Sequence, residues 1–351
     1  MSGDLKSVDV SIIVCSFNRS SRLHDLLSQI VKQEAPPGLG WEIVVVDNNS
    51  TDSTAAMVRQ FIQDHPRHNI QYLFEPAQGL SHARNRGVAE AKGELLAFTD
   101  DDVRIEKGWL SAIAEMISKR EYLGFGGRII PSLPSDLPKW LVLKGPFALT
   151  KGGVIVGHNN GDEVKEYKDR MNRPIGANMF FRKEAFEKFG LFRTDLGKRG
   201  NEIYFGEDVE FCSRLEAGGA RLLYVPRAVV YHPLDPSRLH KRVFRHYYYR
   251  LGWTRGYRKV YLGQAVRNWG TPITLIRQLV KNTGMALIAL ASFRRERLFF
   301  YELEILFLLG QMGVYFTPRG KNAGNPPQYD STGKTPVSEI LSKKVCGDAD
   351  R

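Results

Sequence analysis

The chain has 351 residues, 42% of them hydrophobic and 25% charged, so it can build a sizeable core of the kind found in folded soluble proteins. Its net charge of +12 would suit nucleic-acid binding, so the location of that charge matters. The three cysteines, Cys15, Cys212 and Cys346, lack the spacing of a metal site or a disulfide framework, which indicates a reducing compartment. Residues 1–10 are polar and charged, and no signal peptide is predicted.

The basic excess lies in one segment of the chain. Residues 1–232 contain 30 basic and 30 acidic residues, residues 233–297 contain 14 and 2, and residues 298–351 contain 6 of each. A neutral body with one basic segment beside apolar helices is more typical of a membrane-surface contact than of a nucleic-acid groove.

The first hundred residues alternate short apolar runs with helical patterns. Buried strands are predicted at Val10–Cys15, Glu42–Val46, Gln71–Phe74 and from Leu95, and helices at Ser20–Gln33, Ser53–Gln63, Leu80–Ala91 and Lys107–Lys119. Apolar β-branched runs between helices of this length are typical of parallel strands covered on both faces. We therefore predict an α/β fold with an open, mostly parallel sheet and helices on both faces.

Polar turns follow three of these strands, at Ser16–Asn18, Asp47–Ser50 and Asp100–Asp102. Ligands of open α/β sheets bind outside the carboxyl ends of the strands, so we expect the three turns to meet at one crevice. The first strand is not followed by a glycine-rich dinucleotide fingerprint or a Walker-type lysine loop, which excludes a standard NAD site or P-loop.

Three consecutive carboxylates, Asp100, Asp101 and Asp102, end the Leu95 strand. Alternation along a strand puts Asp100 and Asp102 on one face and Asp101 on the other, so the outer pair can share a ligand. A hard cation such as Mg²⁺ or Mn²⁺ suits two carboxylates and leaves positions open for phosphates. The alternative is an acidic turn that caps the helix at 107–119, because Asp is common at helix N-termini.

Five motifs in this order and spacing carry a family resemblance: IIVCSFNR, EIVVVDNNSTDST, GLSHARNRGVAEAKGELLAFTDDD, GANMFFRKEAF and FGEDVEFCSRL. Together they resemble a family 2 glycosyltransferase of the GT-A fold over roughly residues 8–232. The first motif departs from the family pattern, which often has Pro and Tyr where this chain has Cys15 and Phe17. Phe17 keeps a ring that can stack on a base but lacks the hydroxyl group.

The resemblance implies transfer of a sugar from a nucleotide-sugar donor with inversion at the anomeric carbon. It places the backbone around Ser16, Phe17 and Asn18, together with the carboxylate of Asp47, at the base and ribose. It places Arg84 near the base or the diphosphate.

The resemblance also implies that Asp100 contacts the ribose and that Asp102 binds a metal ion, Mn²⁺ or Mg²⁺, which bridges the diphosphate. His232, at the end of a strand predicted at 228–232, resembles a late family histidine that reaches the ion or the diphosphate. Imidazole is a ligand that Mn²⁺ accepts more readily than Mg²⁺. The alternative for His232 is a packed strand-end histidine.

Inversion requires a base that removes a proton from the acceptor hydroxyl, and Asp208 matches the family's catalytic carboxylate. A free Asp has a pKa of about 3.9, so we expect burial or the neighbouring Glu207, a supporting or acceptor-side residue, to raise the pKa of Asp208. The alternative is that both carboxylates only cap a helix predicted at 209–217.

Two irregular segments are candidates for contacts with the acceptor and the donor. Residues 131–172 are rich in Gly, Pro and Lys and form either an acceptor-side loop, by analogy with the family, or a surface connection. Lys198–Asn201 is a candidate flap over the donor, since Gly197 and Gly200 permit hinge dihedral angles.

After His232 the composition changes. Residues 238–259 interleave arginines with aromatic residues, a mixture that suits stacking on single-stranded bases or a bilayer interface. Thr283–Phe293 is apolar but has only 11 residues, and Leu298–Phe316 is interrupted by Glu302 and Glu304. A transmembrane span, an in-plane or shallow re-entrant pair of helices, and packing on the body all remain open for these helices.

We predict three regions: a GT-A domain at 1–232, a basic and apolar helical membrane-associating region at 233–316, and a disordered tail at 317–351. The expected function is inverting transfer from a nucleotide-diphosphate sugar, UDP-sugar above others, to a glycan or lipid-linked acceptor in cell-envelope or extracellular polysaccharide synthesis. We expect a cytoplasmic protein bound peripherally to anionic lipids at the inner face of the membrane, without a nucleic-acid partner. Alternatives are a nucleotidyltransferase acting on sugar phosphates, a nucleic-acid-binding protein using the basic segment, and an inactive sugar-nucleotide-binding relative.

Overall fold

The computed structural model describes residues 7–150, 153–168, 173–199, 205–262 and 272–316. The tail at 317–351, for which we predict disorder, lies outside the described residues. The described strands are β1 (Val10–Ser16), β2 (Trp41–Asp47), β3 (Ile70–Phe74), β4 (Leu95–Asp100), β5 (Arg104–Ile105), β6 (Gly124–Ser132), β7 (Lys165–Glu166), β8 (Asn178–Arg182) and β9 (Leu222–Pro233). The described helices are α1 (Ser20–Ile30), α2 (Thr54–Asp64), α3 (Leu80–Glu90), α4 (Trp109–Ala114), α5 (Lys183–Phe189), α6 (Glu207–Ala217), α7 (Lys241–Leu262), α8 (Pro272–Ala291) and α9 (Arg295–Phe316).

The described strands form one mixed sheet in the order β3-β2-β1-β4-β8-β6-β9-β5, with β7 beside β9. The α/β prediction is confirmed, and the parallel arrangement extends over β3, β2, β1 and β4. Strand β8 then runs antiparallel to both β4 and β6. Because β6 and β9 are parallel to each other, β9 ends at the same edge of the sheet as β1 and β4.

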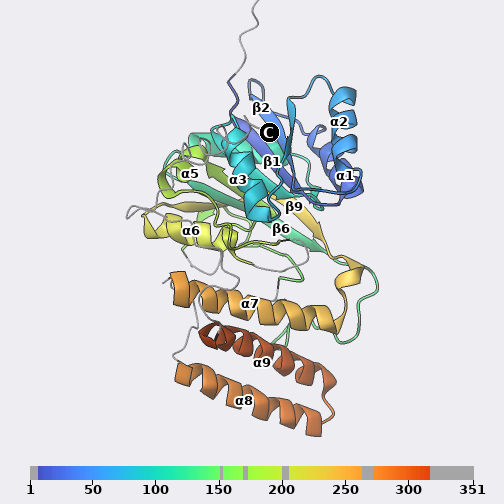
Figure 1. Cartoon of the computed structure of the whole chain (residues 1–351), viewed down its shortest axis with the longest axis vertical. Coiled ribbons are helices and arrows are strands. Elements are labelled where there is room, and N and C mark those ends of the chain that lie inside the picture. The colour runs from blue at the N-terminus through green and yellow to red at the C-terminus, as the bar shows by residue number, and fades with distance from the viewer. Residues whose placement is uncertain (1–6, 151–152, 169–172, 200–204, 263–271, 317–351) are drawn as a thin grey trace, which may run out of the picture.

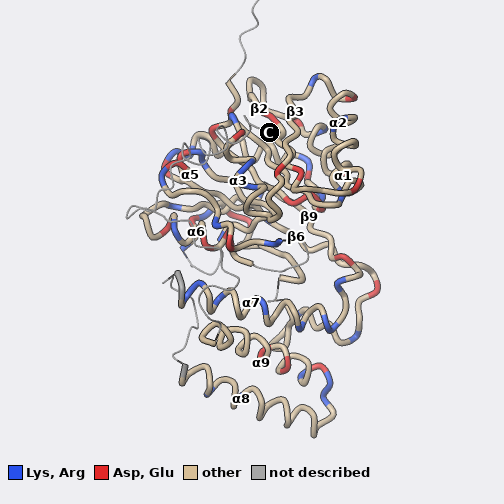
Figure 2. The backbone as a smooth tube through the Cα atoms, viewed as in Figure 1, with Lys and Arg blue, Asp and Glu red and all other residues tan. Residues whose placement is uncertain are grey.

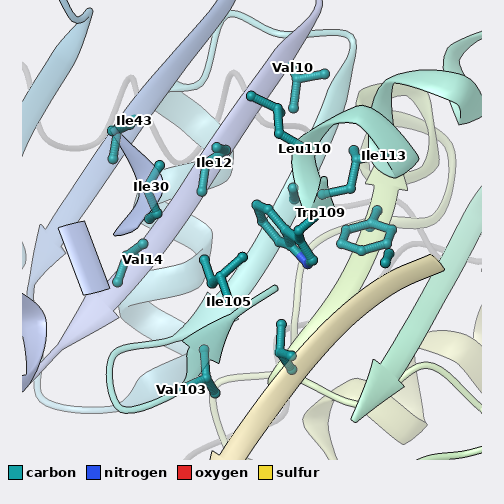
Figure 3. Packing of buried hydrophobic residues seen from close by; sticks show 14 of the residues in the cluster. Val10, Ile12, Val14, Ile30, Ile43, Val103, Ile105, Trp109, Leu110 and Ile113 are labelled. Atoms are coloured by element: carbon teal, nitrogen blue, oxygen red, sulfur yellow. The ribbon is translucent and has the colours of Figure 1, made fainter. Parts of the chain in front are cut away.

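The continuous apolar runs arise because both faces of the sheet are covered. In β1, Val10, Ile12 and Val14 pack with side chains of α1, α2 and α4, whereas Ile13 packs on the opposite face with Ala83 of α3. Figure 3 shows the first of these two cores, in which the β1 side chains and Trp109 share one layer. A strand with one solvated face would instead alternate apolar and polar residues.

The chain order of the strands creates a site for ligands. From β1 the chain continues to β2 and β3 on one side, and it then returns to place β4 on the other side of β1. The connections therefore diverge between β1 and β4, and such a switch point leaves an open crevice at the carboxyl ends of the two strands.

The C-terminal helices lie below the sheet in the order α7, α9, α8 (Figure 1). Lys and Arg are distributed along α7 (Figure 2), but Phe244, Tyr247, Tyr248 and Tyr257 of this helix are buried. Trp140 contacts both Phe244 of α7 and the α9 side chain Phe299. Part of the irregular segment 131–172 is thus packed against the C-terminal helices.

Among the described helices, α9 alone is long and apolar enough to cross a membrane, judged by length and composition. It packs against both α7 and α8, and Phe299, Leu303, Leu308 and Val314 are buried. A helix buried in the core of a soluble protein can have the same length and composition. These properties of α9 therefore fit a transmembrane span, an in-plane or re-entrant pair, and packing on the body equally.

Candidate active site

A cavity of about 250 Å³ lies at the carboxyl ends of β1 and β4. Its walls include eight of the predicted site residues, and they also include Tyr247 of α7. Those predicted to bind donor or metal and found in the lining are Ser16, Phe17, Arg84, Asp100, Asp102 and His232, and the two carboxylates of the predicted base region, Glu207 and Asp208, lie there as well.

Asp100, Asp102 and His232 form one group. A ligand atom from each of the three side chains lies within 4.8 Å of the other two. His232 Nε2 is 3.8 Å from Asp100 Oδ2 and 3.7 Å from Asp102 Oδ1. Burial alone would lower the pKa of His232, but the two neighbouring carboxylates raise it. Two carboxylates and an imidazole are a donor set that fits Mn²⁺, and the two carboxylates also fit Mg²⁺.

A buried ion pair joins this group to α6. Arg84 Nη1 donates a hydrogen bond of 2.6 Å to Glu207 Oε1, and Arg84 Nη2 lies 3.7 Å from Asp100 Oδ1. Burial and the adjacent Asp208 raise the pKa of Glu207 to about 7, against the opposing effect of Arg84.

Asp208 is held by the backbone at the start of α6. Its Oδ2 accepts a hydrogen bond of 2.9 Å from the Gly176 N–H, and its Oδ1 accepts one of 2.7 Å from the Val209 N–H. These bonds fix the carboxylate in the cavity wall. Helix α6 begins at Glu207 with Gly206 as its N-cap residue, so Asp208 lies within the first turn, where a carboxylate also interacts favourably with the helix dipole.

Two predicted donor residues are not among the residues that line the cavity. Asp47 is buried, and its carboxylate accepts hydrogen bonds of 2.9 Å from the Tyr72 hydroxyl and from the Ser50 N–H. Asn18 has a left-handed backbone (φ 52°), and its Oδ1 accepts a hydrogen bond of 2.7 Å from the Thr51 N–H. Both side chains brace the turn after β2.

Comparison with known proteins agrees with this architecture. The family model described as glycosyl transferase family 2 matches residues 11–190, about half of the chain. The chain belongs to this family. It is 27% identical over 241 residues to glycosyltransferase AglE of Haloferax volcanii, covering 67% of this chain and 71% of that protein. It is 26% identical over 251 residues to succinoglycan biosynthesis protein ExoM of Rhizobium meliloti, covering 68% of this chain and 73% of ExoM.

The fold of this family 2 glycosyltransferase is similar to that of a solved structure, mannosyltransferase PcManGT from Pyrobaculum calidifontis in complex with GDP-Man and Mn²⁺. The TM-score is 0.52 at 18% identity, and the match covers 96% of this chain and 79% of the other. The GT-A fold predicted from the motifs is thereby confirmed.

Sequence reasoning missed a basic residue in the glycosyltransferase site. Arg19 Nη1 donates hydrogen bonds of 2.7 Å to Asp101 Oδ1 and 2.8 Å to Asp102 Oδ2. Ser16 Oγ donates one of 2.6 Å to Asp101 Oδ2, so the middle carboxylate of the triplet is already paired. Burial raises the pKa of Asp101 to about 6, against the lowering effect of Arg19. Arg19 could have been predicted, because it ends the motif IIVCSFNR after the first strand, at the same edge of the sheet as Asp100, Asp101 and Asp102.

Four further lining residues of this glycosyltransferase were not predicted as site residues, although Asn48 lies in the polar turn at 47–50 and Lys198 lies in the predicted flap. Asn48 and Gln78 line the cavity beside Phe17, and Tyr247 lines it from α7, 231 residues further along the chain than Ser16 (247 − 16). Lys198 of the predicted flap also lines the cavity, whereas Gly200 and Asn201 of that flap lie outside the described residues.

Proposed function

We propose that this family 2 glycosyltransferase transfers a sugar from a nucleotide-diphosphate sugar to a glycan or lipid-linked acceptor, with inversion at the anomeric carbon. The observation that supports it best is that one cavity holds both the Asp100–Asp102–His232 group and Asp208. The Asp100–Asp102–His232 group would hold a metal ion that binds the diphosphate, and the carboxylate of Asp208 would accept the proton of the acceptor hydroxyl.

Asp100, Asp102 and His232 would hold Mn²⁺ or Mg²⁺. The ion, when bound, neutralises charge on the leaving diphosphate. Arg19 holds one oxygen of Asp102, so the other oxygen, on the side of His232, stays directed at the ion site. The presence of Mn²⁺ in the PcManGT complex supports this assignment.

Asp208 would act as the base. The acceptor oxygen attacks the anomeric carbon, the bond from that carbon to the diphosphate oxygen breaks, and the hydroxyl proton passes to Asp208. The two backbone N–H groups that bind Asp208 keep its carboxylate in place. Glu207 would support this arrangement because its hydrogen bond to Arg84 holds the start of α6 against α3.

Phe17, with Asn48 and Gln78 nearby in the cavity wall, would receive the base, and UDP is the nucleotide we favour. Asp47 and Asn18 would shape this region by holding the turn after β2. Arg84 would approach the diphosphate or the base, since it lies beside Asp100.

The acceptor side would serve polysaccharide or glycolipid synthesis, as the name of ExoM indicates for that relative. We place the enzyme in the cytoplasm, peripherally associated with the inner face of the membrane. Burial of the α7 aromatic side chains Phe244, Tyr247 and Tyr248 leaves them unavailable for stacking on single-stranded bases, which argues against the nucleic-acid alternative.

Calorimetric titration with UDP, GDP, dTDP and CMP, with and without Mn²⁺, tests this proposal. We expect one nucleotide diphosphate to bind in the presence of Mn²⁺ and Asp102→Ala to abolish that binding. Asp25→Ala is the matched control, because the Asp25 side chain is 75% exposed and lies outside the cavity. If wild type binds no nucleotide under either condition, the donor site is wrong.

A further inference from the structure

Helix α8 presents an apolar surface that the described part of the protein does not cover. Large hydrophobic side chains are normally at least half buried in folded proteins, and isolated exceptions need no explanation. On α8, however, six of them are exposed along a single helix: Ile273, Ile276, Val280, Leu287, Ile288 and Leu290.

The spacing of five of these residues puts them on one face. Positions 273, 276, 280, 287 and 290 recur at intervals of three, four and seven residues, which is the period of a helix face. A different face packs on α9, where Leu275 and Ala289 are buried. Helix α8 therefore has one apolar face for the protein and a second that is turned to solvent.

The turn after α8 carries an aromatic residue in an unusual conformation. Phe293 has a left-handed backbone (φ 54°), and its side chain is 91% exposed. Its N–H donates to Leu290 O at 3.0 Å, and the Arg294 N–H donates to Ala289 O at 2.9 Å. This bonding pattern ends many helices, and its left-handed position is usually a glycine.

Phe293 thus strains the backbone although it is almost fully exposed in the part of the chain that the structure describes. A bulky residue at such a position is uncommon, and an observed outlier of this kind is a reason to look for a function. An aromatic ring at an exposed turn is suited to insertion at the headgroup level of a bilayer.

The charged residues around this surface are mostly basic. Residues 272–297 contain five basic residues and one acidic residue, Glu296. Arg277 and Lys281 are exposed on α8 one turn apart, Arg294 is exposed in the turn, and Arg295 and Arg297 are exposed at the start of α9. Figure 2 shows Lys and Arg positions along the backbone where α8 meets α9. Basic side chains beside an apolar helix face are complementary to anionic lipid headgroups.

We propose that the exposed face of α8 and the turn at Phe293 form a surface that docks on an anionic lipid bilayer, with Phe293 inserted between headgroups. This proposal names the surface for the membrane association proposed above. It moves the contact from the aromatic side chains of α7, which are largely buried, to α8. It concerns binding and not transfer, so it can fail while the proposed chemistry stands.

Docking through α8 would also orient the cavity. Helix α8 packs on α9, α9 packs on α7, and Tyr247 of α7 lines the cavity. A lipid-linked acceptor held at the bilayer would therefore meet a catalytic domain whose position is set by three stacked helices.

Vesicle co-sedimentation of the full chain tests the surface. Vesicles of phosphatidylcholine with about one-third phosphatidylglycerol are compared with phosphatidylcholine alone. We expect wild type to bind the anionic vesicles, more weakly at high salt, and Phe293→Gly to bind them roughly tenfold more weakly. Since glycine accepts the left-handed backbone, the melting temperature of Phe293→Gly should be equal to or above that of wild type.

A second pair of variants tests whether vesicle binding depends on the apolar face of α8 or on exposed apolar side chains anywhere on the surface. Val280→Asn should weaken vesicle binding, whereas Val164→Asn on the catalytic body should not, although the two valines are 67% and 51% exposed. Three results would overturn the proposal: no binding of wild type to anionic vesicles, equal binding by Phe293→Gly and Val280→Asn, or a wild-type dimer in light scattering that Val280→Asn dissociates. The last result would assign the face to a second copy of the chain.

Discussion

Arg84 and Glu207 form a buried ion pair between α3 and α6, with 2.6 Å between Arg84 Nη1 and Glu207 Oε1. The same guanidinium lies 3.7 Å from Asp100. One arginine thus connects the carboxylate group after β4 with the carboxylates that begin α6. Removing one partner of a buried pair leaves the other charge uncompensated, which is costly in a low-dielectric interior.

We predict that Arg84→Met lowers the free energy of unfolding by roughly 3–5 kcal/mol, because two acidic side chains then lose their cation. Urea denaturation measures this. Arg86→Met is the matched control on the same helix, since Arg86 pairs with Glu90 at the surface, 3.1 Å away, and its loss should cost about 1 kcal/mol or less. Similar losses for the two variants would contradict the importance assigned to the buried pair.

The titration of Glu207 predicts an unusual pH dependence of stability. Burial and Asp208 raise the pKa of Glu207 in the folded protein to about 7, whereas an unfolded chain has a glutamate pKa of about 4.3. Between these values the folded state holds a proton that the unfolded state has lost, so stability falls as pH rises through this window, by up to about 3 kcal/mol.

Glu207→Gln removes this titration while keeping the shape of the side chain. Urea denaturation between pH 4.5 and 7.5 (about the window given by the two pKa values) should show a smaller decline for the variant than for wild type. If wild type instead gains stability relative to Glu207→Gln over this range, the ion pair with Arg84 outweighs burial and the pKa of Glu207 is lowered.

Asp208→Asn tests the proposed base. Loss of general-base catalysis typically costs about 10²–10⁴ in rate, so kcat for transfer should fall by this factor. Binding of the nucleotide diphosphate should be unchanged, because the asparagine oxygen can still accept the hydrogen bond from Gly176 or Val209. Full transfer activity in the variant would mean that Asp208 only stabilises the first turn of α6.

Much of the catalytic edge could be predicted from local sequence. The apolar runs of β1, β2 and β4 predicted strands buried on both faces, and the polar residues that follow them had to lie at one edge of a parallel sheet. His232 could be placed near Asp100 and Asp102 once β9 was recognised as a strand ending at that edge.

Other features depend on contacts between distant residues. Strand β8 inserts antiparallel between β4 and β6, and Asn178 at its start bonds to Arg128 O, Ala228 O and the Trp109 indole N–H. A Cβ at Gly127 would lie 2.2 Å from the amide of Asn178, so the glycine is required by a residue 51 positions away (178 − 127). No local pattern contains that information.

The same limit applies to the donor side. The family resemblance places Asp47 at the base and ribose, and in the structure its oxygens accept hydrogen bonds from the Tyr72 hydroxyl and the Ser50 N–H. Its orientation follows from the neighbouring strand β3, which brings Tyr72 beside it. Similarly, the aromatic residues of α7 suggested an interface, and packing with Trp140 and α9 determines that most of them are buried.

Helices α7 and α9 are in close contact, and this contact links α8 to the cavity. A Cβ at Gly252 would lie 2.0 Å from Phe307 O, and one at Gly310 would lie 2.1 Å from Tyr249 O. Gly252→Ala and Gly310→Ala should therefore force the helices apart and cost about 1–3 kcal/mol in urea denaturation. Gly284→Ala on α8 is the control: no atom lies within 4 Å of its added Cβ, and removing a helical glycine should stabilise the protein by about 0.5–1 kcal/mol.

Because Tyr247 lines the cavity from α7, the two destabilising variants should also weaken acceptor binding, measured as a higher KM for the acceptor at unchanged nucleotide affinity. Stabilisation by all three alanines would mean that α7 and α9 are not in contact in solution.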